Sequence, residues 1–198
     1  CNSAPSATAY GAETFVMGMD KTNANMALVQ KENAVILKEN NYESNYEGFD
    51  PYSPESYVIF SLLQNAYLTQ STNFANKVQK AFAQDLNRYD RGVKQAPFLV
   101  LWRTTMPSVL IELGFLGNKE EEAYLTSEKG KNELSRSIYR AISQTIEELE
   151  NLAKEIGVDM ENDVIVPAIP DDETFTERLI TIIREICKEN LNDLKMIF

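Results

Sequence analysis

The stretch from Met106 to Leu125 (MPSVLIELGFLGNKEEEAYL) places a carboxylate directly after an apolar run. Val109, Leu110 and Ile111 predict a buried strand, and Glu112 follows at once. In open α/β sheets, reacting groups collect at the carboxyl ends of strands. Glu112 is predicted to lie at such an end, so we regard it as a candidate functional residue of this chain.

A structural role for Glu112 is the alternative. A carboxylate at the rim of a sheet can face solvent or pair with a nearby cation, and Lys94 and Arg103 are the candidate partners. Ion-pair networks of this kind are common and need no catalytic role. The spacing of these residues leaves both interpretations open.

The segments around Glu112 predict an α/β fold. Apolar, β-branched and aromatic residues predict strands at residues 11–19, 98–102 and 108–113, the last two buried. Continuously apolar strands that alternate with helices are typical of a sheet covered on both faces. We expect a partial mixed sheet flanked by helices, with a loop at residues 87–97.

Apolar residues at helical spacing predict the covering helices. We expect one at residues 22–39, one after the Ser53-Pro54 cap, one after Ser71, a turn or short helix at 118–126 and a long amphipathic helix at about 127–156.

The domain expected from these elements covers residues 1–150 and includes a helical insertion at 35–70. Residues 151–198 are read as a linker, rich in proline and acidic residues, followed by an acidic helical tail of unknown role. A capping-box pattern at Thr174 predicts that helix.

Composition excludes several classes of protein. The 198 residues include 30 acidic and 19 basic side chains, a net charge of −11, which argues against nucleic-acid binding. The longest apolar run is far shorter than the roughly 20 residues of a transmembrane helix. Cys1 and Cys187 make no disulfide framework, and histidine is absent. Because no initiator Met is present, we expect the chain to start inside a longer protein or after processing.

The sequence RGVKQAPFLVLWRTTMPSVLIELGFLGNKEEEAYL resembles the zinc-dependent N-acetylmuramoyl-L-alanine amidases, which cleave bacterial cell-wall peptidoglycan. The N-terminal Asn2-Ser3-Ala4 and the later run Gly11 to Phe15 are similar to the family's loop and next strand. The resemblance covers about residues 1–150. The shared motif positions are Arg91, Gly92, Val93, Lys94, Met106, Pro107, Val109, Leu110, Glu112, Gly114, Phe115, Asn118 and Glu121.

The resemblance implies hydrolysis of the amide between the lactyl group of N-acetylmuramic acid and L-alanine. In this family two histidines and a glutamate hold a metal ion, and a further glutamate at a strand end does the acid-base work, which is the position of Glu112. The family's metal ligands precede the matched region, the second histidine falling just before Cys1. We therefore expect the C-terminal portion of an amidase domain, with its zinc ligands outside this chain and without activity in isolation.

The resemblance also implies contacts with substrate and partners. Asn2 and Arg103 are candidate substrate-binding residues, although Asn2 can also serve as a plain turn former and Arg103 can simply offset the acidic surface. Peptidoglycan lies outside the inner membrane, so we expect a periplasmic or extracellular protein of the cell envelope.

Residues 35–56 are similar to a helical insertion in amidases that act in cell separation. In that subgroup the insertion covers the active site until an activator protein moves it. Such a lid would bring Glu39, Glu43 or Glu47 to the metal and would be autoinhibitory. The alternative is a solvated helix and loop without a regulatory role.

A non-catalytic module is the second functional interpretation. It would be derived from an amidase and would bind the cell wall or an activator protein. A purely helical structural protein is disfavoured by the two apolar strand runs ahead of Glu112.

Overall fold

The computed structural model describes residues 1–2, 7–18, 26–57, 67–102, 104 and 106–156. The expected linker and tail helix at 157–198 lie outside this part of the chain, as does Arg103. Of the helix expected after Ser53-Pro54, residues 54–57 are described and are helical.

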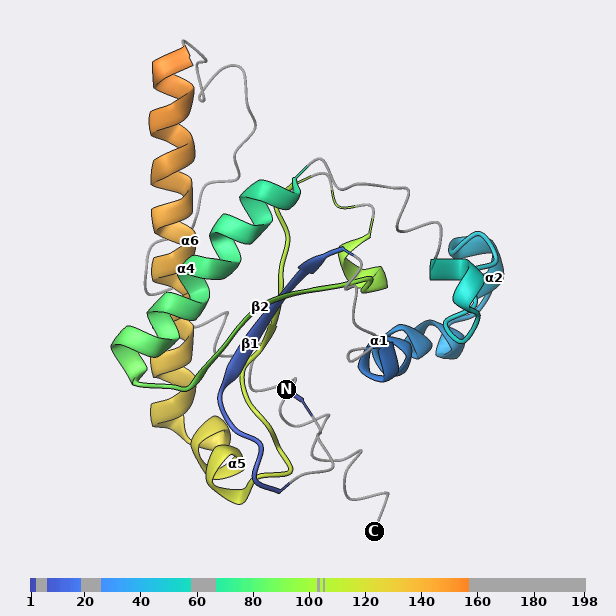
Figure 1. The fold of residues 1–198 in the computed structure, drawn as a ribbon, viewed down its shortest axis with the longest axis horizontal. Helices are drawn as coiled ribbons and strands as arrows, with labels where there is room; N and C mark the ends of the chain where they lie inside the picture. The colour runs from blue at the N-terminus through green and yellow to red at the C-terminus, as the bar shows by residue number, and fades with distance from the viewer. Residues whose placement is uncertain (3–6, 19–25, 58–66, 103, 105, 157–198) are drawn as a thin grey trace. The chain divides into compact units, whose positions relative to one another are not determined.

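The described strands form one mixed sheet flanked by helices (Figure 1), which confirms the predicted fold class. Strands β1 (Ala12–Met17), β2 (Asp90–Ala96) and β3 (Leu110–Glu112) lie in the order β2-β1-β3. All six residues of the central strand β1 are buried, as expected for a strand paired on both edges. Glu112 is the last residue of β3, as predicted from the apolar run before it.

Two local predictions are wrong, and they lie next to each other. The loop expected at residues 87–97 contains strand β2, and the strand expected at 98–102 is instead the 3-10 turn η3 (Leu99–Leu101). Phe98 and Leu101 are nevertheless buried, so the apolar run correctly indicated burial but not the backbone geometry. A short apolar run does not distinguish a strand from another buried segment. β2, in contrast, is a strand because it pairs with β1, which is distant in sequence.

The chain divides into two compact units, each described by itself. The first comprises Cys1–Glu13, Lys77–Arg91 and the described residues from Glu112 onward. It contains the end of α4 (Leu68–Leu86), α5 (Lys119–Thr126) and α6 (Glu128–Ile156). Ion pairs from Lys77 to Glu148 (2.7 Å) and from Arg140 to Asp85 hold α4 against α6.

Helices α4, α5 and α6 confirm three predicted helices, and each has a local cause. Asn118 caps α5, because its Oδ1 accepts hydrogen bonds from the N–H groups of Glu120 (2.9 Å) and Glu121 (3.4 Å). One face of α6 places Leu134, Ile138 and Ala141 in the interior.

The second unit comprises Thr14–Asn76 and Gly92–Ile111. It contains α1 (Met26–Asn33), the 3-10 helix η2 (Ala34–Lys38), α2 (Tyr42–Asn45) and η3, so the helix expected at 22–39 changes to 3-10 geometry after Asn33. Phe15 and Phe98 meet edge to face, with ring centroids 5.1 Å apart. Its buried apolar core consists of Phe15, Met17, Val29, Ile36, Phe49, Tyr57, Ala96, Phe98, Leu99 and Leu101.

No helix among the described residues has both the length and the apolar character needed to cross a membrane.

Candidate active site

Glu112 is buried at the end of β3, with 5% of its surface exposed. Its Oε2 lies 3.1 Å from the backbone nitrogen of Cys1. Of the two cations considered as partners, Lys94 lies 5.7 Å from the centroid of the Phe15 ring, and Arg103 lies outside the described residues. Burial at the strand end holds this carboxylate in place, and proton transfer by a general acid-base requires a positioned side chain.

Backbone pairing places Cys1 beside Glu112. The N–H of Asn2 donates to the carbonyl of Gly114 (2.8 Å), and the N–H of Leu116 donates to the carbonyl of Asn2 (3.0 Å), which makes a parallel bridge with Phe115. Asn2 therefore lies in a β-bridge. Its role towards substrate stays a prediction.

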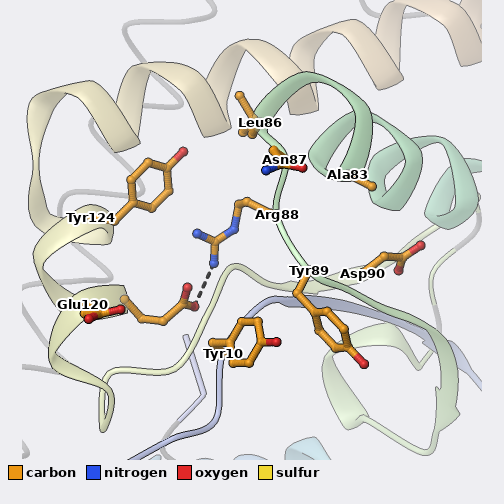
Figure 2. A pocket seen from close by; sticks show the side chains of 10 residues that line it. Tyr10, Ala83, Leu86, Asn87, Arg88, Tyr89, Asp90, Glu120 and Tyr124 are labelled. Atoms are coloured by element: carbon orange, nitrogen blue, oxygen red, sulfur yellow. Dashed lines mark hydrogen bonds and ion pairs between the residues drawn. The ribbon is translucent and has the colours of Figure 1, made fainter.

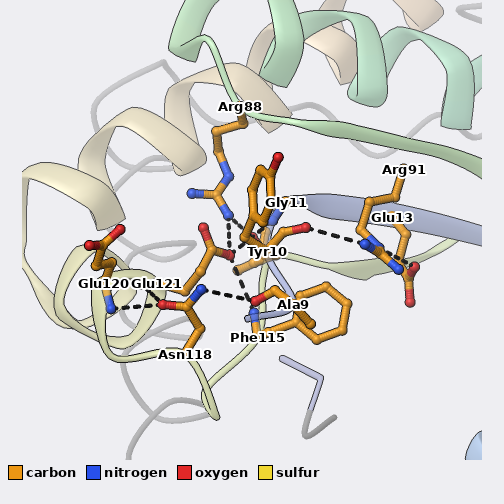
Figure 3. A network of polar contacts seen from close by, with 11 residues as sticks. Ala9, Tyr10, Gly11, Glu13, Arg88, Arg91, Phe115, Asn118, Glu120 and Glu121 are labelled. Carbon is orange, nitrogen blue, oxygen red and sulfur yellow. Dashed lines mark hydrogen bonds and ion pairs between the residues drawn. The ribbon is translucent and has the colours of Figure 1, made fainter. Parts of the chain in front are cut away.

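Glu13 is a buried carboxylate next to this bridge, and only 3% of its surface is exposed. It accepts a hydrogen bond from Asn2 Nδ2 (3.0 Å). It also accepts one from Arg91 Nε (3.0 Å), as Figure 3 shows. The Arg91 guanidinium lies 4.8 Å from the Phe115 ring centroid. The sequence analysis gave Glu13 no role of its own. Its place inside the predicted strand at 11–19 was the available signal, because a carboxylate buried in a strand needs polar partners.

Glu121 contacts the segment that follows Glu112. Its Oε2 accepts hydrogen bonds from Arg88 Nη2 (2.8 Å) and from the N–H groups of Gly11 (3.3 Å) and Phe115 (3.4 Å), as Figure 3 shows. Arg88 Nη2 also donates to the carbonyl of Leu113 (2.8 Å), the residue after Glu112. Glu121 thus fixes the backbone around the candidate acid-base.

Gly114 is required beside Glu121 for a steric reason. A Cβ at position 114 would overlap Glu121 Oε2 and crowd the Arg88 guanidinium. Gly114, Asn118 and Glu121 all belong to the motif around Glu112, and the structure gives each of them a positioning contact.

A cavity of about 680 Å³ lies in the same unit, and Glu112 is not among its lining residues (Figure 2). Burial, followed by the hydrogen bond that its hydroxyl donates to Glu133 (3.0 Å), raises the pKa of Tyr124 to about 12. The lining residues are Tyr10, Ala83, Leu86, Asn87, Arg88, Tyr89, Asp90, Glu120, Glu121 and Tyr124.

The residues present do not fit a zinc site. Within the described ranges no group of three histidine, cysteine, aspartate or glutamate side chains could hold a metal ion, and the whole sequence has no histidine. Catalytic zinc sites use three protein ligands, and Glu112 alone does not supply them.

The three glutamates of the predicted lid are exposed in the second unit. The Tyr46 hydroxyl donates to both oxygens of Glu39 (2.9 and 3.1 Å), and this hydrogen bond raises the pKa of Tyr46. Glu43 lies on α2, and Glu47 follows it in a left-handed conformation with φ of 55°. The structure does not bring these glutamates together with Glu112 in one unit.

Comparison with known protein families shows which family the chain belongs to. The model of the N-acetylmuramoyl-L-alanine amidase family matches residues 1–144. The chain belongs to this family. That finding confirms the resemblance seen at Glu112.

Known amidases are among the relatives of this chain. It is 34% identical over 108 residues to an uncharacterised cell wall amidase of Bacillus anthracis (54% of this chain, 20% of the relative). It is 35% identical over 69 residues to the N-acetylmuramoyl-L-alanine amidase LytC of Bacillus subtilis (35% and 14%). It is 28% identical over 85 residues to the amidase AmiA of Escherichia coli (43% and 29%).

Among solved structures, the catalytic domain of the amidase CwlV from Bacillus (Paenibacillus) polymyxa aligns with a TM-score of 0.46 at 25% identity. The alignment covers 74% of this chain and 54% of that domain. The chain thus spans about half of this amidase domain and less than a third of the length of the three relatives above.

Proposed function

We propose that this chain is part of a peptidoglycan hydrolase, an N-acetylmuramoyl-L-alanine amidase in which Glu112 is the general acid-base. The bond cleaved is the amide between the lactyl group of N-acetylmuramic acid and L-alanine. The observation that carries the proposal is the position of Glu112, buried at the end of β3 inside a family match over residues 1–144.

The chemistry assigned to Glu112 is a proton relay. Its carboxylate takes a proton from the attacking water, and the water oxygen bonds to the lactyl carbonyl carbon. The same carboxyl group then gives the proton to the nitrogen as the C–N bond breaks. The products are a lactyl carboxylate and the free amine of L-alanine.

We propose that zinc is required by a longer form of this protein. The nitrogen of Cys1 lies 3.1 Å from Glu112 Oε2, so any residue joined to it would lie beside that carboxylate. The family resemblance expects a histidine ligand at that place. The isolated chain, which has no histidine, should therefore be inactive.

The test uses a longer protein with its native upstream sequence, assayed by dye release from labelled peptidoglycan and by the appearance of N-terminal L-alanine. Glu112→Gln should lower the rate about 10²- to 10⁴-fold, the usual contribution of a positioned acid-base. Glu147→Gln, an exposed glutamate on α6, is the matched control and should keep full activity. A Glu112→Gln rate within a few-fold of the parent would refute the assignment.

We propose that residues 35–56 act as a lid that an activator protein displaces. A simple deletion is a poor test, because Ile36 and Phe49 belong to the core of the second unit. Replacing exposed Glu39, Glu43 and Glu47 together by glutamine keeps those core side chains. In the longer protein this should raise hydrolysis without activator, and an unchanged or lower rate would argue against the lid.

The proposed substrate contacts and location follow from the same function. Asn2→Ala and Arg103→Ala should raise KM for peptidoglycan in the longer protein. Since peptidoglycan lies outside the inner membrane, we propose a periplasmic or extracellular location, which fractionation of cells expressing the native gene would check.

A non-catalytic wall- or activator-binding module is the second candidate, favoured by the absence of histidine from the sequence. In that case the longer protein would bind insoluble peptidoglycan without releasing L-alanine, and Glu112→Gln would change neither measurement.

A further inference from the structure

We propose that the cavity of about 680 Å³ in the first unit binds N-acetylated sugar residues of the wall glycan, at a site separate from Glu112. The identity of the ligand rests on the proposed function, whereas the cavity and its lining do not. Its volume is in the range of small-molecule sites, about 300 to 1,000 Å³.

Two exposed tyrosines form one side of this cavity. Tyr10 is 51% exposed and Tyr89 is 54% exposed, and their ring centroids lie 5.0 Å apart with an interplanar angle of 50° (Figure 2). Tyrosine combines an apolar ring face with a polar hydroxyl, so exposed rings favour ligands of the same mixed character. A pyranose ring has a C–H face and a rim of hydroxyls, and it matches both parts.

Arg88 supplies an unused hydrogen-bond donor in the lining. Its side chain is 8% exposed, and Nη2 serves the Leu113 carbonyl and Glu121. Its buried Nε–H has no hydrogen-bond partner in the described part of the chain. Buried donors without an acceptor are rare in folded proteins. The carbonyl oxygen of an acetamido group, directly or through one water, is an acceptor of the right kind.

The charges around the cavity disfavour an anionic ligand. Asp90, Glu120 and Glu121 would repel a phosphate, and Arg88 is already paired with Glu121. Exposed Asp90 and Glu120 carboxylates can accept hydrogen bonds from sugar hydroxyls and from an acetamido N–H. An N-acetylated sugar offers the donors, acceptors and apolar face that this lining requires.

The experiment is a titration of the chain with the tetramer of N-acetylglucosamine, followed by NMR with ¹⁵N-labelled tyrosine and by calorimetry. Tyr10→Ala and Tyr89→Ala should each weaken binding by roughly two- to tenfold, the range expected for one aromatic contact. Tyr52→Ala is the matched control, because Tyr52 is 59% exposed and lies in the second unit. Its affinity should equal that of the parent chain.

Two further ligands identify the group recognised and its source. Cellotetraose, which lacks the acetamido groups, should bind more weakly than the tetramer. A disaccharide of N-acetylglucosamine and N-acetylmuramic acid, with its lactyl carboxyl amidated and so uncharged, should bind more tightly than the dimer of N-acetylglucosamine if the site serves the wall. Equal affinity would assign the site to N-acetylglucosamine polymers in general and overturn the assignment to the wall glycan.

Absence of saturable binding, or equal affinity of the parent chain and both tyrosine variants, would overturn the proposal. Because Tyr10 and Tyr89 are exposed, their variants should fold, and circular dichroism checks this. The Glu112→Gln chain should bind as the parent does. If the longer protein binds the sugar but does not hydrolyse peptidoglycan, the proposed sugar site holds and the amidase assignment fails. If it hydrolyses peptidoglycan but the chain does not bind the sugar, the amidase assignment holds and the proposed sugar site fails.

Discussion

Asn33 should be a strong determinant of stability in the second unit. Its side chain is buried and joins three segments: Nδ2 donates to the Pro97 carbonyl (3.0 Å) and the Tyr57 hydroxyl (3.3 Å), and Oδ1 accepts from the Leu99 N–H (2.8 Å). Asn33→Ala removes these bonds at once. The Leu99 N–H and the Pro97 carbonyl are both left buried without that partner.

The magnitude follows from those two groups. Each buried polar group that loses its partner costs about 1–3 kcal/mol, so Asn33→Ala should lower the free energy of unfolding by about 2–6 kcal/mol. Tyr57 adds little, because its hydroxyl keeps the hydrogen bond to the Pro51 carbonyl (2.8 Å).

Urea unfolding followed by tryptophan fluorescence measures this effect, because the single tryptophan, Trp102, packs against the core of the same unit. Asn45→Ala, an exposed asparagine on α2, is the control and should change stability by no more than about 0.5 kcal/mol. If Asn33→Ala unfolds at the same urea concentration as the control and with the same slope, the hydrogen bonds of Asn33 do not stabilise this unit.

Three further predictions concern the first unit. Gly114→Ala should cost about 1–3 kcal/mol in thermal or urea unfolding, because the new methyl group displaces Glu121; unchanged stability would contradict the overlap. Arg91→Met should cost about 1–3 kcal/mol, less than a fully buried pair because Arg91 is partly exposed, and Asn2 should lose protection from hydrogen exchange. The pKa of Tyr124 is raised from 10.0 to about 12, so the folded chain holds this proton more tightly than the unfolded chain. Stability from this group is complete below pH 10 and should fall as pH rises towards 12, and Tyr124→Phe should show a smaller fall in urea unfolding across that window.

The sequence predicts well the elements that carry their own local signal. Helix α6 has a long amphipathic face, α5 has the Asn118 cap, and β3 has an apolar run that stops at Glu112. Strand β2 has no such signal. Its sequence DRGVKQA is polar and mostly half-exposed, and it becomes a strand because it pairs with β1, far away in sequence.

The candidate site shows the same limit. Glu112 could be singled out because it directly follows an apolar run in the sequence. Glu13 instead gains its role from Arg91, 78 residues away, and Arg88 gains its role from Glu121, 33 residues away. Motif resemblance pointed to Arg91 and Glu121 but gave no reason for them. The reason is steric and electrostatic: each forms an ion pair with a buried group beside the segment that follows Glu112.

The bridge between Asn2 and Phe115 has a consequence for tolerance to insertions. Side chains alternate along a strand, so a slip of one position would turn the Asn2 amide away from Glu13 and break their 3.0 Å bond. The register between Asn2 and Phe115 is thus fixed by two contacts, the main-chain pairing and the hydrogen bond of the Asn2 side chain. An added residue at positions 113–116 should therefore disturb Glu112 as severely as a substitution of Glu112 itself, although it alters no reactive group.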